Sequence, residues 1–126
     1  VLASAASLAA TAEAVGGVWR GAAMALLGVG HNDLRALVLD VRARLRPEDP
    51  AAVLLASPGE RGVSFVAAVN EAGRAAGVAA GELVGAFAPV LGARGGGKPD
   101  LAQGAGGDPA QLPAAFEAVR HLLRSR

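Results

Sequence analysis

The chain has 126 residues, the size of one domain, and 52% of them are hydrophobic, which excludes global disorder. Its 12 basic and 11 acidic residues give a net charge of +1, which excludes an overall basic field that would attract nucleic acid. Cysteine is absent, which excludes disulfides, thiol catalysis and cysteine-ligated zinc. The two histidines are far apart in sequence, so no metal is expected.

The first residues, Val1–Ala6, are not a translation start, so we interpret the chain as part of a longer protein. They lack the basic region of a signal peptide, and no apolar run approaches the ~20 residues that span a bilayer. These features favour a cytoplasmic protein without membrane contact.

Strong helix formers over residues 1–14 predict the end of a helical linker, followed by a globular domain over residues 15–126. The apolar residues Val18-Trp19 and Ala23–Val29 then suit a buried strand. A helix capped by Asn32 or Asp33 comes next.

Pro47 and Pro50 should end this helix. Its apolar residues recur with a period of 3.6 and are Leu34, Leu37, Val38, Val41 and Leu45. Another face carries Arg35, Arg42 and Arg46, which indicates a solvated surface, with a binding role as the alternative.

Two apolar runs, Ala52–Ala56 and Val63–Val69, predict a β-hairpin with a loop of about five residues. A polar link then runs over Asn70–Gly77. Ala79–Leu91 predicts a helix, whose last turn Pro89 should kink or shorten.

Gly92–Gly107 indicates a glycine-rich loop, and Asp108 with Pro109 predicts the start of a final helix. The apolar stripe of that helix consists of Leu112, Phe116, Val119 and Leu123. The order of elements predicts a small α/β domain, with a mixed sheet of about three to four strands and helices packed on it. The glycine loop should lie at one edge, where it is free to meet a partner.

The run Gly95-Gly96-Gly97 lets a backbone adopt positive φ or approach another backbone closely, and amides in such turns bind anions. Arg94 precedes the run and Lys98 follows it, so the loop indicates a phosphate or nucleic-acid contact.

A nucleotide-hydrolase loop is excluded, although Gly92 and Gly97-Lys98 have its spacing. Pro99 stands where Ser or Thr would hold magnesium, and a helix rather than a strand precedes the loop. Asp100 and Gln103 either pin the loop internally or face the partner. The chain also has no nucleophile elbow and no histidine with an obvious partner, so we expect no catalysis.

Single-strand readers need exposed rings for stacking, whereas each aromatic residue here fits a core stripe. These residues are Trp19, Phe65, Phe87 and Phe116. Folded RNA is instead recognised through shape, phosphates and sugar hydroxyls, which suits a backbone-rich loop beside Arg94 and Lys98, with Arg61 or Arg74 as accessories.

The run Gly95–Gln103, followed by Gly106-Gly107, resembles the GGG-R/K-P-D-M/L-A-Q-x-G-G signature near the end of alanyl-tRNA synthetases. Ala80–Gly85 resembles the helix start of the same family, and the similarity covers roughly residues 15–126. Phosphoesterases of the DHH type usually have a histidine after the three glycines, so Lys98 favours the synthetase branch.

This resemblance implies the synthetase's C-terminal globular domain, C-Ala, which is related to the accessory domain of DHH phosphoesterases. It implies a non-catalytic domain that contacts the outer corner of tRNA and helps couple aminoacylation to editing. ATP, magnesium and zinc would belong to other domains of the parent ligase, leaving this chain without a cofactor. The implied tRNA-binding residues are Arg94, Gly95, Gly96, Gly97, Lys98, Asp100 and Gln103.

Some residues depart from the signature: Ala93 and Arg94 replace a common glycine and lysine, and Gly104-Ala105 adds one residue before Gly106-Gly107. Other interpretations stay open. One is a structural or dimerising module whose loop packs on a partner subunit. Another is the matching domain of a free-standing alanyl-tRNA editing protein or of a DHH phosphoesterase.

Overall fold

The computed structural model describes residues 13–15, 19–25, 31–44, 48, 50–59 and 62–124. The strands are β1 (Glu13–Val15), β2 (Trp19–Ala25), β3 (Ala51–Gly59), β4 (Gly62–Val69), β5 (Ala93–Gly97) and β6 (Leu101–Gly106). The helices are α2 (His31–Arg44), α3 (Glu71–Ala75), α4 (Ala80–Leu91) and α5 (Leu112–Arg124), with a 3₁₀ turn, η1 (Pro109–Gln111).

The described strands form one mixed sheet in the order β1-β2-β3-β4-β6-β5. Among the described strands, β2 and β3 alone pair in parallel, and α2 lies in the crossover that parallel neighbours need. The predicted class, a small α/β domain with a mixed sheet, is confirmed. The described strands number six, more than the predicted three to four, because the glycine-rich segment forms β5 and β6 and a short β1 is added.

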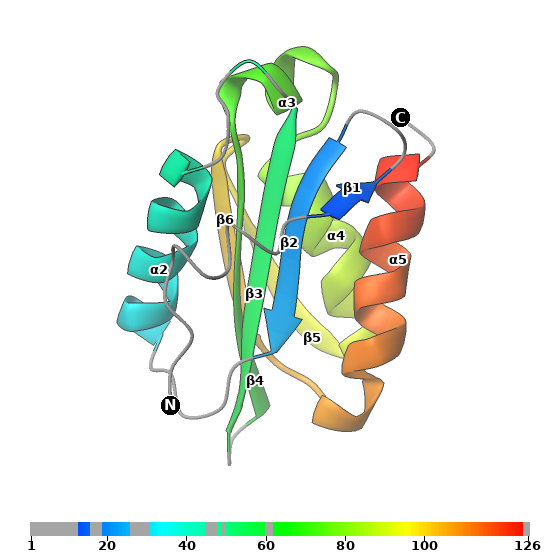
Figure 1. Cartoon of the computed structure of the whole chain (residues 1–126). Coiled ribbons are helices and arrows are strands. Elements are labelled where there is room, and N and C mark those ends of the chain that lie inside the picture. Colours follow the sequence, from blue (N-terminus) through cyan, green and yellow to red (C-terminus); the bar gives the residue numbers. More distant parts are fainter. Residues whose placement is uncertain are drawn as a thin grey trace.

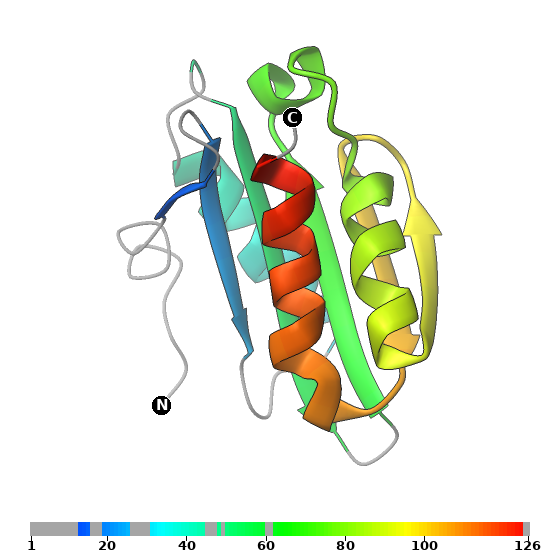
Figure 2. The same ribbon diagram turned by 90° about the vertical axis from the view of Figure 1, so that its right-hand side faces the viewer.

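The helices lie on both faces of the sheet, with α2 on one face and α4 with α5 on the other (Figure 1, Figure 2). The central strand β3 is therefore covered on both sides. Its Leu54 and Ala56 pack in the cluster under α4 and α5, whereas Val53 and Leu55 pack in the cluster under α2. This double burial explains why β3 is a continuous apolar run without alternation.

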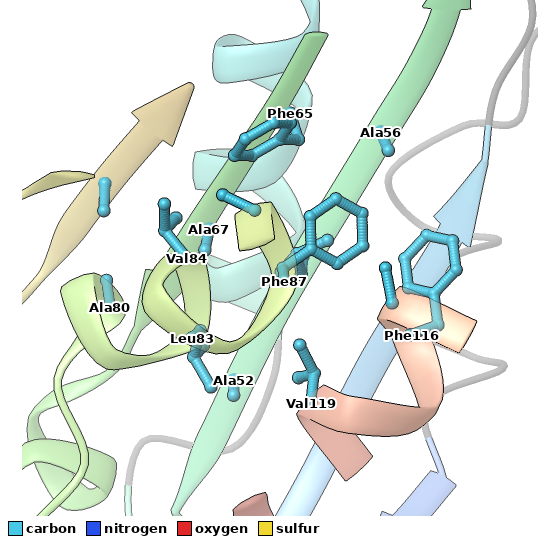
Figure 3. Packing of buried hydrophobic residues seen from close by; sticks show 14 of the residues in the cluster. Ala52, Ala56, Phe65, Ala67, Ala80, Leu83, Val84, Phe87, Phe116 and Val119 are labelled. Carbon is cyan, nitrogen blue, oxygen red and sulfur yellow. The ribbon is translucent and has the colours of Figure 1, made fainter. Parts of the chain in front are cut away.

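Three phenylalanine rings fill the larger cluster, between the sheet and the pair α4 and α5 (Figure 3). The Phe87 ring lies 5.1 Å, centroid to centroid, from the rings of both Phe65 and Phe116. This confirms the core positions predicted for these three residues, so they offer no ring for stacking on a base. The side chain of Trp19 lies outside the described part of the chain.

The smaller cluster is built on α2, where Leu34, Val38 and Val41 are each 0% exposed. The predicted apolar stripe is thus confirmed. The predicted capping is wrong, because α2 already begins at His31 and Asn32 lies in its first turn. The expected helix end at residues 45–47, which includes Leu45 and Arg46, lies outside the described residues.

The predicted N-terminal helix lies mostly outside the described residues, which start at residue 13. Its last two residues, Glu13 and Ala14, are in β1, where backbone pairing with Gly21 and Arg20 replaces a helical turn. The apolar run predicted as a buried strand gives β2, and its residues 26–29 are not among those described.

The β3–β4 hairpin is confirmed, but its loop is shorter than predicted. Gly59 pairs with Gly62, so two residues connect the strands instead of about five. Pro58 lies within β3, opposite Val63, because the ladder continues beyond the apolar run. Arg61, a predicted RNA accessory, lies outside the described residues.

The predicted polar link contains the short helix α3. The Oδ1 atom of Asn70 accepts hydrogen bonds from the amides of Gly73 (2.8 Å) and Ala51 (2.9 Å), which caps α3 and fixes the start of β3. Arg74 on α3, the other predicted accessory, donates to the Val69 carbonyl oxygen at 2.7 Å.

Pro89 does not shorten α4, which continues to Leu91. A proline in the last turn removes only one backbone bond, and the amide of Gly92 caps the helix end in a left-handed conformation (φ 78°). Asp108 and Pro109 start the 3₁₀ turn η1 and not, as predicted, the final helix itself. The Asp108 carboxylate accepts from the Ala110 amide at 3.0 Å, and α5 follows directly after the turn, from Leu112. Within the described residues, no helix has the length and apolar character that crossing a membrane requires.

Candidate functional site

The glycine-rich segment is a β-hairpin and not the predicted loop. β5 and β6 pair in antiparallel register, and β6 also pairs with β4, so the hairpin completes one edge of the sheet. Glycine has low strand propensity, but here tertiary pairing with β4 outweighs it. The extra residues Gly104 and Ala105 pair with Gly95 and Arg94, so the added length is part of β6.

The tip of the hairpin is held by backbone hydrogen bonds on two sides. The carbonyl oxygen of Asp100 accepts from the Val69 amide at 3.1 Å, at the end of β4. The carbonyl oxygen of Pro99 accepts from the Ala80 amide at 2.7 Å, at the start of α4. The tip therefore has a fixed position relative to both the sheet and α4.

Close packing explains the glycine at position 95. A Cβ atom there would lie 2.7 Å from the Gln103 carbonyl oxygen and 2.9 Å from Cγ1 of Val84 on α4. Such distances are shorter than any ordinary contact, so a side chain would force β5 away from β6 and α4. At Gly96, on the other side of the strand, a Cβ would meet no atom within 4 Å.

The open side of the hairpin is the face that carries α2. Ala102 is buried on the α4 side, so its neighbours Leu101 and Gln103 point to the α2 side. Gly96 pairs with Gln103, which puts Gly96 and Arg94 on the same side. α2 itself packs on β3 and β4, and a cleft remains between α2 and the hairpin.

The cleft has a volume of about 320 Å³. It is lined by Arg35, Gly96, Gly97, Lys98, Asp100, Leu101 and Gln103. Five of the seven residues predicted as site residues thus come together in it. Arg94 follows the same face two residues before Gly96, and Gly95 lies on the opposite, α4 side.

Arg35 and Leu101 line the cleft although neither was predicted as a site residue. The sequence did contain a sign of Arg35, because three arginines share one face of the predicted helix and such a face can border a binding site. Arg42, two turns further along the row, donates from Nη1 to the Asp100 carbonyl oxygen at 3.2 Å and ties α2 to the hairpin tip.

The cleft carries a local positive charge. The side chains of Arg35, Arg94 and Lys98 form no ion pair or hydrogen bond with another described residue. All three residues are exposed, and Asp100 is the acidic residue in the lining. An anionic group therefore finds two cations in the cleft and a third beside it.

Residues 21–125 match the DHHA1 domain, and the chain belongs to this family. Among its relatives, the alanine–tRNA ligase of Nocardia farcinica is 50% identical over 120 residues, which is 95% of this chain and 13% of the ligase. The solved C-Ala domain of Aquifex aeolicus alanyl-tRNA synthetase superposes with a TM-score of 0.81 at 29% identity, covering 90% of this chain and 98% of that domain.

RecJ from Thermus thermophilus superposes with a TM-score of 0.60 at 18% identity, covering 82% of this chain and 14% of RecJ, which shows the shared fold. The resemblance to the C-Ala domain that the glycine motif indicated is confirmed. The chain spans about an eighth of the length of the curated ligases that it matches.

Proposed function

We propose that this chain is the tRNA-binding accessory domain of an alanyl-tRNA synthetase, contacting the outer corner of tRNA and aiding the coupling of aminoacylation to editing. The observation that supports this most directly is the cleft at the hairpin, where Lys98 is exposed and unpaired and Arg94 lies on the same face. We name tRNA as the bound RNA because the chain is homologous to alanine–tRNA ligases.

The chemistry of the cleft suits the backbone of a folded RNA better than its bases. The three phenylalanine residues belong to the core, so base stacking has no platform among them. Gly96 and Gly97 form a part of the lining without side chains, which lets a sugar–phosphate chain approach the protein backbone closely. Phosphates and ribose hydroxyls are the groups by which folded RNA is usually recognised.

The predicted site residues take different parts in this proposal. Arg94 and Lys98 attract phosphates, and Gly96 with Gly97 admits the backbone. Asp100 contributes mainly through its carbonyl oxygen, which fixes the tip, and Gln103 lines the cleft floor. Gly95 acts by allowing β5 to lie close to β6.

We further propose that this domain, over residues 15–126, is non-catalytic and needs no cofactor. ATP, magnesium and zinc would act in the other domains of a cytoplasmic parent ligase, which are then also its partners. The alternative is that this domain belongs to a free-standing editing protein or to a DHH phosphoesterase. The sequence that precedes this domain in the parent protein distinguishes these possibilities.

A structural or dimerising role is a second candidate, favoured by the position of β5. It is the last strand of the sheet on its side, so its outer backbone groups have no neighbouring strand among the described elements. Such an edge pairs readily with a strand of another chain. In this case Arg94 and Lys98 would influence association and not RNA affinity.

The deciding experiment is a titration of the chain with folded tRNA at several salt concentrations, with an unstructured RNA of equal length as control. We expect weak binding that prefers folded tRNA, with a salt slope of about −1.5 to −2 for two phosphate contacts. Arg94→Ala and Lys98→Ala should each weaken binding, while sedimentation shows an unchanged association state. Equal affinity for both RNAs, or unaltered affinity in both variants, would refute the proposal.

A further inference from the structure

Two arginines on the same side of α2, Arg35 and Arg42, have different surroundings. Arg42 is half-buried and donates to the Asp100 carbonyl oxygen, so it holds the hairpin tip against the helix. Arg35 lies seven residues earlier, two turns away on the same side of α2, and it lines the cleft. It is exposed, and its guanidinium has no partner among the described residues.

We propose that Arg35 is a further RNA-binding residue and that the cleft takes one backbone phosphodiester, held between the Arg35 guanidinium and the Lys98 ammonium group. This inference rests on the proposed function. It names the group of the RNA that enters the cleft and adds α2 to the RNA-binding surface.

The two cations come from two different elements that border the cleft, Arg35 from α2 and Lys98 from the hairpin tip. Both elements are fixed relative to each other by the Arg42–Asp100 hydrogen bond and by the bond from Val69 to the same carbonyl. A phosphate entering the cleft therefore meets two cations whose backbones are already in place, so that binding orders only their side chains.

The guanidinium group suits this task, because its planar fork of donors can bind two oxygens of one phosphate. The volume of about 320 Å³ exceeds what one phosphate needs and leaves room for the adjoining ribose. The open space beside Gly96, where no atom lies within 4 Å of a Cβ position, is the path for that sugar.

The test compares four variants of the whole chain: Arg35→Ala, Lys98→Ala, the double variant, and Arg120→Ala as the charge-matched control. Arg120 lies on α5, on the other face of the sheet, where it pairs with Glu117 at 3.6 Å. Binding of a folded alanine-tRNA transcript is measured at several salt concentrations. Thermal melting verifies that each variant is folded.

We expect Arg35→Ala to lower tRNA affinity roughly 5- to 20-fold at low salt, whereas Arg120→Ala leaves it unchanged. The salt slope should fall by less than the ~0.9 of a whole phosphate contact in Arg35→Ala, because Lys98 still neutralises the same phosphate, and by about 0.9 in the double variant. Because both cations hold the same phosphate, the double variant should lose less affinity than the product of the two single losses.

Three results would overturn the inference, and they differ in what they leave standing. If Lys98→Ala weakens binding while Arg35→Ala matches Arg120→Ala, the RNA contact excludes α2 and the proposed function remains. If the two single losses multiply in the double variant, Arg35 and Lys98 serve separate phosphates. If the unaltered chain does not prefer folded tRNA, the proposed function fails and the inference fails with it.

Discussion

Replacing Gly95 and Gly96 by alanine, one at a time, tests the packing of the hairpin with a matched pair of neighbouring residues. At position 95 the added Cβ would lie 2.7 Å from one backbone oxygen and 2.8 Å from the Gly104 Cα, and neither atom belongs to a movable side chain. Overpacking of this kind destabilises by about 1–3 kcal/mol. With an unfolding entropy of about 2.1 cal/mol/K per residue over 126 residues, the melting temperature should fall by roughly 4–11 °C.

At position 96 the same methyl group meets no atom within 4 Å, and Gly96 is not among the glycines with positive φ. Alanine there restricts only the unfolded chain, so we expect a gain of about 0.4–1 kcal/mol and a small rise in melting temperature. Thermal melting followed by circular dichroism measures both changes. A Gly95→Ala variant that melts at or above the Gly96→Ala variant would refute the packing explanation of the glycine run.

Three further predictions concern the core, a cap and the cleft. Phe87→Ala removes a fully buried ring and should lower the free energy of unfolding by about 3–5 kcal/mol in urea titrations; a loss below about 1 kcal/mol would contradict its central position. Asn70→Ala leaves the amides of Ala51 and Gly73 without this acceptor and should lower the free energy of unfolding by about 1–3 kcal/mol. Asn70→Asp keeps an acceptor oxygen and should lose less stability. Equal losses in urea titrations of both variants would contradict the role of the acceptor. Asp100→Asn removes the negative charge from the cleft lining and should raise tRNA affinity about 2- to 5-fold at low salt, an effect that fades as salt is added. Unchanged affinity at low salt would mean that this carboxylate does not face the RNA.

Sequence periodicity was sufficient for the elements with strong apolar patterns. Leu34, Val38 and Val41 on α2, and Phe87 on α4, are buried as their spacing predicts. These residues are buried because they form the apolar face of an amphipathic helix, and that face can be recognised from the periodicity of a single segment.

The glycine hairpin was not predictable from local sequence, because what makes it a strand lies elsewhere in the chain. Ala102 is held by Ala67 of β4, and Gly95 is closed over by Val84 of α4. Local propensity predicts a flexible loop for a run of glycines. In the folded chain, the absence of side chains at these positions lets β5 pack closely against β6 and α4. Arg35 was not predicted as a site residue for a similar reason: it is far from Lys98 in sequence, and only the folded chain brings both residues to one cleft.

The bond from the Ala80 amide to the Pro99 carbonyl has a mechanical consequence. The chain leaves α4 at Leu91, returns along β5, and is joined again to the first residue of the helix, so helix and strand form a closed frame of covalent and hydrogen bonds. Local opening of the hairpin tip therefore requires that this bond to the helix is broken as well. Lys98 directly precedes Pro99, so this cation lies where the chain is bonded back to the start of α4.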